Sequence, residues 1–128
     1  ALVDDFLARI RPLSKIDVVE LRDAGPDREA REMTDRLGSI RGTQLVVAMD
    51  EKGEDVTSVD LSRLLAAHGD ICFLIGGADG LGEAARGRAA RTLRLSSMTL
   101  THEMARLVLV EQIYRGLTIL RGMPYHRA

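Results

Sequence analysis

The chain ends in a concentration of reactive side chains. Tyr125, His126 and Arg127 follow Pro124 directly, at the end of a chain of 128 residues. An imidazole titrates near neutral pH and can move a proton, a phenol can stack or donate a hydrogen bond, and a guanidinium can hold an anion. Chain ends are often simply frayed, but the proline and this combination of side chains favour a functional site.

A glycine-rich turn is the second feature with chemical meaning. A continuous apolar run over residues 71–75 leads into Gly76 and Gly77. Ligands of open α/β sheets bind at the carboxyl ends of strands, and a residue without Cβ lets a ligand approach the backbone. Two further segments end predicted strands, one at Met49 and one at residues 95–100. We expect the three segments to converge on one ligand of nucleotide type.

Other motifs carry less weight. Gly80-Leu81-Gly82 matches the start of a dinucleotide-binding pattern, but about one strand follows it, and no acidic residue at a strand end stands about 20 residues further on. A tight strand-to-helix turn explains these glycines better than a dinucleotide site. The three histidines and single cysteine lack the spacing of metal ligands, and no G-x-S-x-G elbow supports a serine hydrolase.

Composition bounds the class of protein. The length suits a single domain over residues 1–128, and 45% hydrophobic with only 3% aromatic residues predicts an aliphatic core. The single cysteine, Cys72, cannot form an internal disulfide, which favours a reduced, cytoplasmic protein. No apolar run approaches the roughly 20 residues of a membrane span, and no signal peptide is visible.

The net charge of -1 hides an asymmetry along the chain. Residues 83–128 hold eight arginines against three glutamates, whereas residues 1–82 hold ten basic against sixteen acidic residues. A positive C-terminal part beside the predicted site suits an anionic partner such as RNA. Solvated helix faces are the alternative explanation.

Helices and strands must alternate to position these residues. Apolar runs that are continuous rather than alternating predict an α/β fold, with a mostly parallel sheet and helices on both faces. The last helix is apolar on two sides, so it needs a second surface besides its own sheet, and we expect a second subunit to provide it. The sequence predicts helices over residues 2–10, 26–37, 57–67, 80–90 and 103–122, and strands over residues 16–21, 43–49, 70–75 and 92–95.

Four segments, taken in order, resemble the RlmH family of bacterial methyltransferases, which act on a pseudouridine of large-subunit ribosomal RNA. They are LIGGADGL at residues 74–81, LSSMTLTH at 95–102, RLVLVEQIYR at 106–115 and PYHR at 124–127. The ordered match is specific from about residue 70 to the end, and only the element order agrees over residues 16–67.

This resemblance implies the SPOUT fold, an α/β domain whose C-terminal segment threads a trefoil knot. It also implies a homodimer that binds S-adenosylmethionine and forms N3-methylpseudouridine in 23S ribosomal RNA of the assembled 70S ribosome. Carried over by position, the cofactor contacts are Met49, Gly76, Leu95, Ser96, Ser97, Met98, Thr99 and Leu100.

The resemblance also suggests roles for the C-terminal residues. His126 is the expected base or proton relay, Tyr125 orients the target base, and Arg115 stabilises negative charge that develops on the ring. The residues expected to hold RNA are Arg127, Arg106 and His102. Metal ligands are not expected.

Two other functions stay open at this point. The chain is alternatively a non-catalytic module that binds or assembles ribosomes, or, less favoured, an oxidoreductase built on Gly80 and Gly82. The family begins with a strand before the first helix, and this sequence lacks it. We therefore expect that an N-terminal piece is missing.

Overall fold

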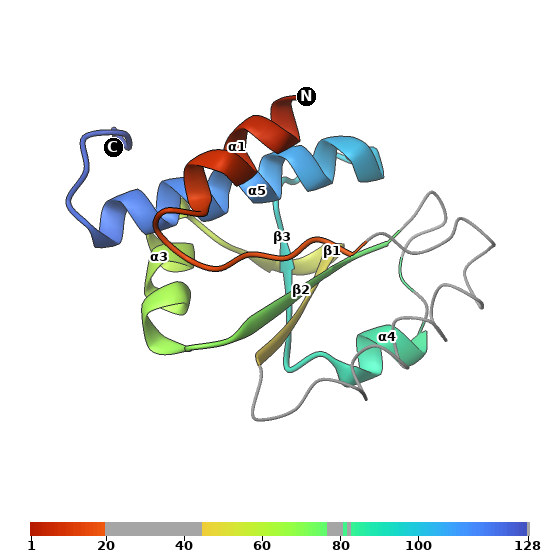
Figure 1. Cartoon of the computed structure of the whole chain (residues 1–128). Helices are drawn as coiled ribbons and strands as arrows, with labels where there is room; N and C mark the ends of the chain where they lie inside the picture. Colours follow the sequence, from red (N-terminus) through yellow and green to blue (C-terminus); the bar gives the residue numbers. More distant parts are fainter. Residues whose placement is uncertain (20–44, 77–80, 82, 128) are drawn as a thin grey trace.

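Three parallel strands form the sheet, with β1 in the middle of the order β2-β1-β3 (Figure 1). The computed structural model describes residues 1–19, 45–76, 81 and 83–127. Their elements are α1 (Leu2–Ile10), β1 (Leu45–Asp55), α3 (Ser58–Ala67), β2 (Ile71–Ile75), α4 (Glu83–Arg88), β3 (Arg91–Arg94) and α5 (His102–Leu120).

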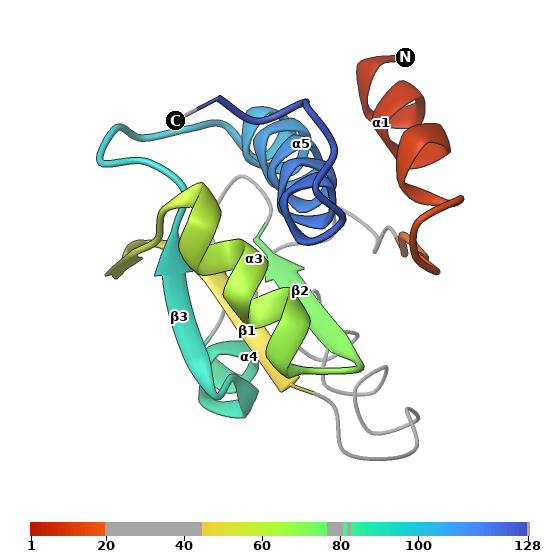
Figure 2. The same ribbon diagram turned by 90° about the vertical axis from the view of Figure 1, so that its left-hand side faces the viewer.

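Both faces of the sheet are covered, as the continuous apolar strands predicted. Side chains alternate along β1, so Val47 packs on one face with Leu61 of α3 and Leu109 of α5. Ala48 packs on the opposite face with Leu81. Ala89, just after α4, packs against the same cluster. Figure 2 shows α3 and α5 stacked on one side of the strands. The α/β fold with helices on both faces is therefore confirmed.

The start of α3 is fixed by a capping box. Thr57 Oγ1 accepts from the Asp60 backbone nitrogen at 3.0 Å, and the Asp60 carboxylate accepts from the Thr57 backbone nitrogen at 3.0 Å. The hydrogen bond from the Thr57 backbone, followed by that from its side chain, lowers the pKa of Asp60. The predicted helix start at residues 57–58 is confirmed.

The long helix α5 is buried on two sides, but the second surface belongs to the same chain. Leu7 and Ile10 of α1 pack against Val110 and Tyr114 of α5. Helix α1 of the same chain therefore supplies part of the second surface that α5 needs, and the expected second subunit stays a prediction. Figure 1 shows α1 lying along α5.

Strand β1 does not stop after Met49 as predicted. It runs to Asp55 with a register shift, so that both Met49 and Glu54 pair with Leu93 of β3. The polar residues 50–53 bulge out of the ladder instead of ending the strand. A Cβ at Gly53 would lie 2.7 Å from backbone carbons of Thr92 and Leu93, so only glycine allows this close return to β3.

Three other predicted elements differ or fall outside the description. Residues 16–19 form no strand; Ile16 instead packs beside the α1–α5 cluster. The helix expected over 80–90 is described over Glu83–Arg88, and it ends there because Ala90 donates its backbone hydrogen to Val46 at 2.8 Å and joins the sheet. The rest of the predicted strand 16–21 and the predicted helix 26–37 lie outside the described residues.

The trefoil knot stays an implication of the resemblance. Residues 77–80 and 82, just before the C-terminal segment that the resemblance expects to be knotted, lie outside the described residues. Within the described ranges, no helix has both the length and the apolar character needed to cross a bilayer.

Candidate functional site

The three predicted ligand-binding segments lie at one edge of the sheet. Met49 pairs with Ile75 of β2 and with Leu93 of β3, and all pairings are parallel. Gly76 directly follows Ile75, and Leu95 directly follows the end of β3. Gly76 and Leu95 therefore lie near Met49 at the edge where β2 and β3 end, which is where ligands of such sheets bind, although β1 itself continues to Asp55. The three segments are thus neighbours in the sheet, and their convergence on one ligand stays a prediction.

The segment from Leu95 to Leu100 is held in place by hydroxyl groups. Ser96 Oγ accepts from the Met98 backbone nitrogen at 2.9 Å, which makes a local turn. Thr99 Oγ1 donates to Glu51 Oε2 at 3.0 Å and ties the segment to the β1 bulge. Ser97, Met98 and Thr99 are exposed, while Leu95, Ser96 and Leu100 are half-buried.

The β1 bulge is itself braced, and the sequence did not identify it as part of the site. Lys52 donates its backbone hydrogen to Asp50 Oδ1 at 2.9 Å, and the Asp50 carboxylate lies 3.6 Å from the Arg86 guanidinium. These contacts place Glu51 against Thr99. Gly53, four residues beyond the predicted strand end at Met49, was the available signal for the close return to β3.

A Schellman turn reverses the chain after α5. Gly122 has φ +66°, Met123 donates its backbone hydrogen to Thr118 at 2.9 Å, and Gly122 donates to Ile119 at 3.2 Å. A residue with Cβ adopts this left-handed conformation only at a cost. The turn directs the C-terminal tail back along the helix (Figure 1).

The predicted catalytic residues come together where the tail meets α5. Arg115 Nη1 lies 3.1 Å from Nδ1 of His126, and the guanidinium carbon lies 4.7 Å from the centre of the Tyr125 ring. The Tyr125 ring in turn packs edge-on against Tyr114, with ring centres 4.7 Å apart. Tyr125 and His126 are half-buried. The tail is thus docked on the helix, not frayed.

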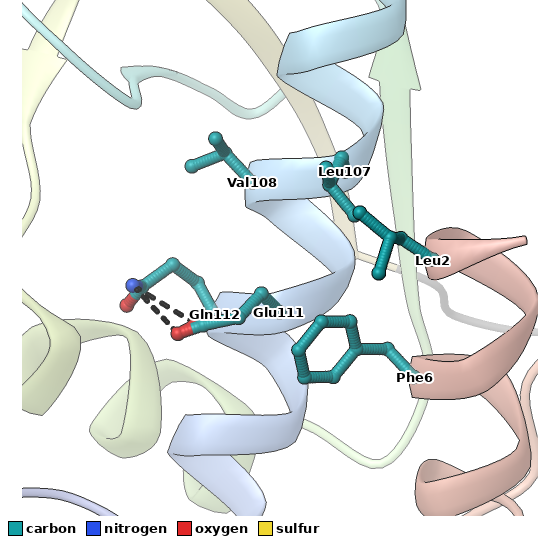
Figure 3. Close-up of a pocket in the computed structure, with 6 residues that line it drawn as sticks. All are labelled: Leu2, Phe6, Leu107, Val108, Glu111 and Gln112. Carbon is teal, nitrogen blue, oxygen red and sulfur yellow. Dashed lines mark hydrogen bonds between the residues drawn. The ribbon is translucent and has the colours of Figure 1, made fainter.

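Two neighbouring residues that the sequence analysis missed complete this cluster. Glu111 Oε1 accepts from Arg115 Nε at 2.8 Å, and Gln112 Nε2 lies 3.5 Å from both carboxylate oxygens of Glu111 (Figure 3). The four-residue spacing of Glu111 and Arg115 on a helix was the signal that could have found the first contact. Both residues also line a groove of about 320 Å³ between α1 and α5.

The residues predicted to bind RNA do not gather in one place. His102 and Arg106 lie one turn apart near the start of α5, where His102 is exposed and Arg106 half-buried. Arg127 is exposed in the tail beyond the other end of that helix. At a rise of 1.5 Å per residue, about 20 Å of helix separates Thr101 from Arg115. The strand-end segments and the tail cluster therefore lie apart along α5.

Cys72 and the acidic side chains add no further reactive centre. Burial raises the pKa of the Cys72 thiol, so less of it is the reactive thiolate. Across the part of the chain that the structure describes, no three His, Cys, Asp or Glu side chains form a group that could hold a metal ion.

Comparison with known proteins identifies the family of this chain. The family described as "Predicted SPOUT methyltransferase" matches residues 1–126. A protein of Parasynechococcus marenigrum named "Ribosomal RNA large subunit methyltransferase H" is 44% identical over 91% of this chain and 80% of its own length. Proteins of the same name from Anaeromyxobacter sp. and Geotalea daltonii are 40% and 41% identical, over 98% and 97% of this chain and 88% and 87% of their own. The chain therefore belongs to the SPOUT methyltransferases and, among them, to the RlmH family.

Proposed function

We propose that the protein transfers a methyl group from S-adenosylmethionine to N3 of a pseudouridine in 23S ribosomal RNA, within the 70S ribosome. The names of its relatives support the ribosomal RNA substrate. The observation that carries the proposal is the pairing of Met49 with both Ile75 and Leu93, which brings Met49 beside the ends of β2 and β3, where Gly76 and Leu95 follow. Because the proposed substrate is the ribosome, we expect the protein to lie in the cytoplasm.

The strand-end segments fit the proposed cofactor. Gly76 presents backbone without a side chain, and the turn at Ser96 holds exposed backbone of residues 97–99 in a defined shape. The carboxylate of Glu51 beside Thr99 suits a ligand with a positive charge. When bound, S-adenosylmethionine supplies a methyl carbon whose bond to sulfur breaks, with its electron pair left on sulfur, as a bond to N3 forms. Met49, Gly76 and residues 95–100 are the proposed contacts.

The tail cluster suits the other half of the reaction. The imide nitrogen must lose its proton, and charge then spreads over the neighbouring carbonyl oxygens of the ring. His126 and the Arg115 guanidinium, 3.1 Å apart, provide polar hydrogens and positive charge for such a group. Tyr125 offers an aromatic surface to a base. Arg127, Arg106 and His102 are the proposed RNA contacts.

The separation of the two halves supports a homodimer. Methyl transfer requires the nitrogen in line with the methyl carbon, so the reacting groups must meet within a few ångströms. In one chain, about 20 Å of α5 lies between Thr101 and Arg115. We propose that the tail of a second subunit completes each site. The half-exposed apolar side chains of Leu107 and Val108, in the groove beside α1, give a second subunit surface to pack on.

Transfer of tritium from labelled S-adenosylmethionine to 70S ribosomes tests the proposal. Free subunits and naked 23S RNA serve as control substrates, and the labelled nucleoside is identified by chromatography. We expect label in N3-methylpseudouridine with 70S ribosomes and none with His126→Ala. Absence of transfer by a protein that binds the cofactor would contradict the proposal and favour a non-catalytic ribosome-binding module.

A further inference from the structure

A chain of polar contacts leads from the start of α3 to the C-terminal tail. Ser58 Oγ donates to Gln112 Oε1 at 2.5 Å, and Gln112 Nε2 lies 3.5 Å from the Glu111 carboxylate. Glu111 accepts from Arg115 Nε at 2.8 Å, and Arg115 Nη1 lies 3.1 Å from Nδ1 of His126. Figure 3 shows the Gln112 amide nitrogen facing Glu111. Residues far apart in sequence are thus connected to the tail imidazole.

The direction of donation along this chain follows from the chemistry of its members. An ionised carboxylate such as Glu111 only accepts, and the guanidinium of Arg115 only donates because it does not lose its proton. Nδ1 of His126 must therefore accept the hydrogen bond from Arg115. A neutral imidazole whose Nδ1 accepts carries its proton on Nε2.

We infer that Glu111 is a positioning residue, which orients Arg115 so that Arg115 holds His126 in its Nε2–H tautomer. This inference rests on the proposed methyl transfer and makes the part played by His126 more specific. Both anchoring side chains are mostly shielded, with Arg115 24% and Glu111 19% exposed, so solvent competes weakly for their contacts. Tyr125 lies against the same guanidinium and limits its movement further.

In this tautomer His126 offers a donor to the substrate instead of a basic nitrogen. A general base needs an unprotonated nitrogen facing the proton that it removes. Nδ1 is occupied by Arg115, and Nε2 already carries a hydrogen. The Nε2–H group instead stabilises negative charge on a carbonyl oxygen next to N3. The proton of N3 passes to solvent water and not to His126, and the methyl group then takes its place on the nitrogen.

Nuclear magnetic resonance of the imidazole nitrogens tests the tautomer directly. Long-range proton–nitrogen correlation spectra of the labelled full chain separate protonated from unprotonated ring nitrogens, and the loss of signals in His126→Gln assigns His126. We expect an unprotonated Nδ1 and a protonated Nε2 in the wild type. Glu111→Ala should mix the two tautomers, because Arg115 loses its anchor, while Glu103→Ala on the same helix should not. A protonated Nδ1 in the wild type, or a Glu111→Ala spectrum like the wild type, would overturn the inference.

Turnover gives a second, independent measurement. We expect Glu111→Ala to lower kcat about tenfold with unchanged affinity for S-adenosylmethionine, a size typical of residues that orient a functional group. His126→Gln keeps an amide donor but no base, so its kcat should exceed that of His126→Ala at least about tenfold. Equal loss in both variants would contradict the donor role. The tautomer is measured without substrate, so the two tests are independent. If the spectra are as expected but no methyl group is transferred, only the proposed function is contradicted.

Discussion

Arg115, in the C-terminal half of α5, holds His126 with 3.1 Å between Nη1 and Nδ1, although the two residues are eleven positions apart along the chain. The contact depends on the Schellman turn at Gly122, which returns the tail to the helix that it has just left. One residue of α5 and one residue just after it therefore build one site. Gly122 sets the direction of the tail, and Arg115 fixes the orientation of the His126 imidazole.

Replacing Arg115 by lysine should separate charge from geometry. Lysine keeps the positive charge but cannot contact Glu111 and His126 together, because its ammonium lacks the planar fork of a guanidinium. We expect kcat to fall about 100-fold, as for loss of one stabilising donor group, with an unchanged dissociation constant for S-adenosylmethionine in calorimetry. Arg121→Lys is the matched control, since Arg121 Nη2 donates to the Leu13 carbonyl at 2.7 Å, away from His126. Full activity in Arg115→Lys would contradict the claim that a planar guanidinium is needed to contact Glu111 and His126 together.

Gly122→Ala should release the tail from α5. Alanine at φ +66° costs about 1–2 kcal/mol, and detachment of the tail relieves that strain. We expect a lower kcat, an unchanged affinity for S-adenosylmethionine and faster proteolytic cleavage of the tail that follows Leu120. Gly87→Ala is the control, because a Cβ there meets no atom within 4 Å and α4 gains an alanine. A tail equally protected in Gly122→Ala and the wild type would contradict this role of the turn.

Gly53→Ala should damage the cofactor side of the site instead. Its Cβ would lie 2.7 Å from backbone carbons of β3, which cannot move without breaking the ladder. We expect the free energy of unfolding to fall by about 2 kcal/mol or more, as for other overpacked positions, together with weaker binding of S-adenosylmethionine. Urea denaturation and calorimetry measure the two effects. Gly69→Ala, where a Cβ meets nothing within 4 Å, should change neither.

Glu51→Ala should loosen the segment that follows β3. The variant removes the acceptor of the Thr99 hydroxyl, a contact of 3.0 Å. A hydrogen bond of this kind contributes about 0.5–1.5 kcal/mol, so we expect affinity for S-adenosylmethionine to fall roughly 3- to 10-fold. Glu54→Ala, directly after the bulge, is the control, because Glu54 pairs with Arg91 at 3.8 Å and both of these side chains are exposed. Equal affinities in both variants would show that Glu51 does not support the segment.

The parallel sheet and the neighbourhood of the three predicted ligand-binding segments could be predicted because they depend on local patterns. Apolar runs such as residues 71–75 are long enough to mark a buried strand, and parallel strands place their ends together whatever else the fold contains. The predicted tail residues came together for a similar reason. Gly122 and Pro124 bound a turn, and the helix before them supplies Arg115 at a suitable position.

Contacts between distant segments could not be predicted in the same way. The bulge at residues 50–53 depends on the backbone of Thr92 and Leu93, which periodicity within the bulge does not reveal. The covering of α5 by α1 depends on which apolar surfaces meet, and the sequence showed only that α5 needed two. Glu111 was missed because an acidic residue on a helix more often faces solvent than orients a neighbour.

The capping box of α3 predicts how stability depends on pH. Hydrogen bonds from the Thr57 backbone and side chain lower the pKa of Asp60 below its ordinary value of 3.8. A carboxyl group whose pKa is lower in the folded state stabilises the fold above its unfolded pKa. That contribution is lost as the pH falls through the lower folded value. We therefore expect the free energy of unfolding, measured with urea, to decrease on acidification below about pH 4, the unfolded range of aspartate.

Three variants assign this acid dependence. Asp60→Asn should flatten the acid slope, although part of it remains because Arg94 also lowers the pKa of Asp55. Thr57→Ala should weaken the slope and cost about 1 kcal/mol near neutral pH, the usual effect of losing an N-cap hydroxyl. Thr57→Ser keeps the hydroxyl and should behave like the wild type. An acid slope in Asp60→Asn as steep as in the wild type would show that the carboxylate is not held by the cap, and that other groups carry the pH dependence.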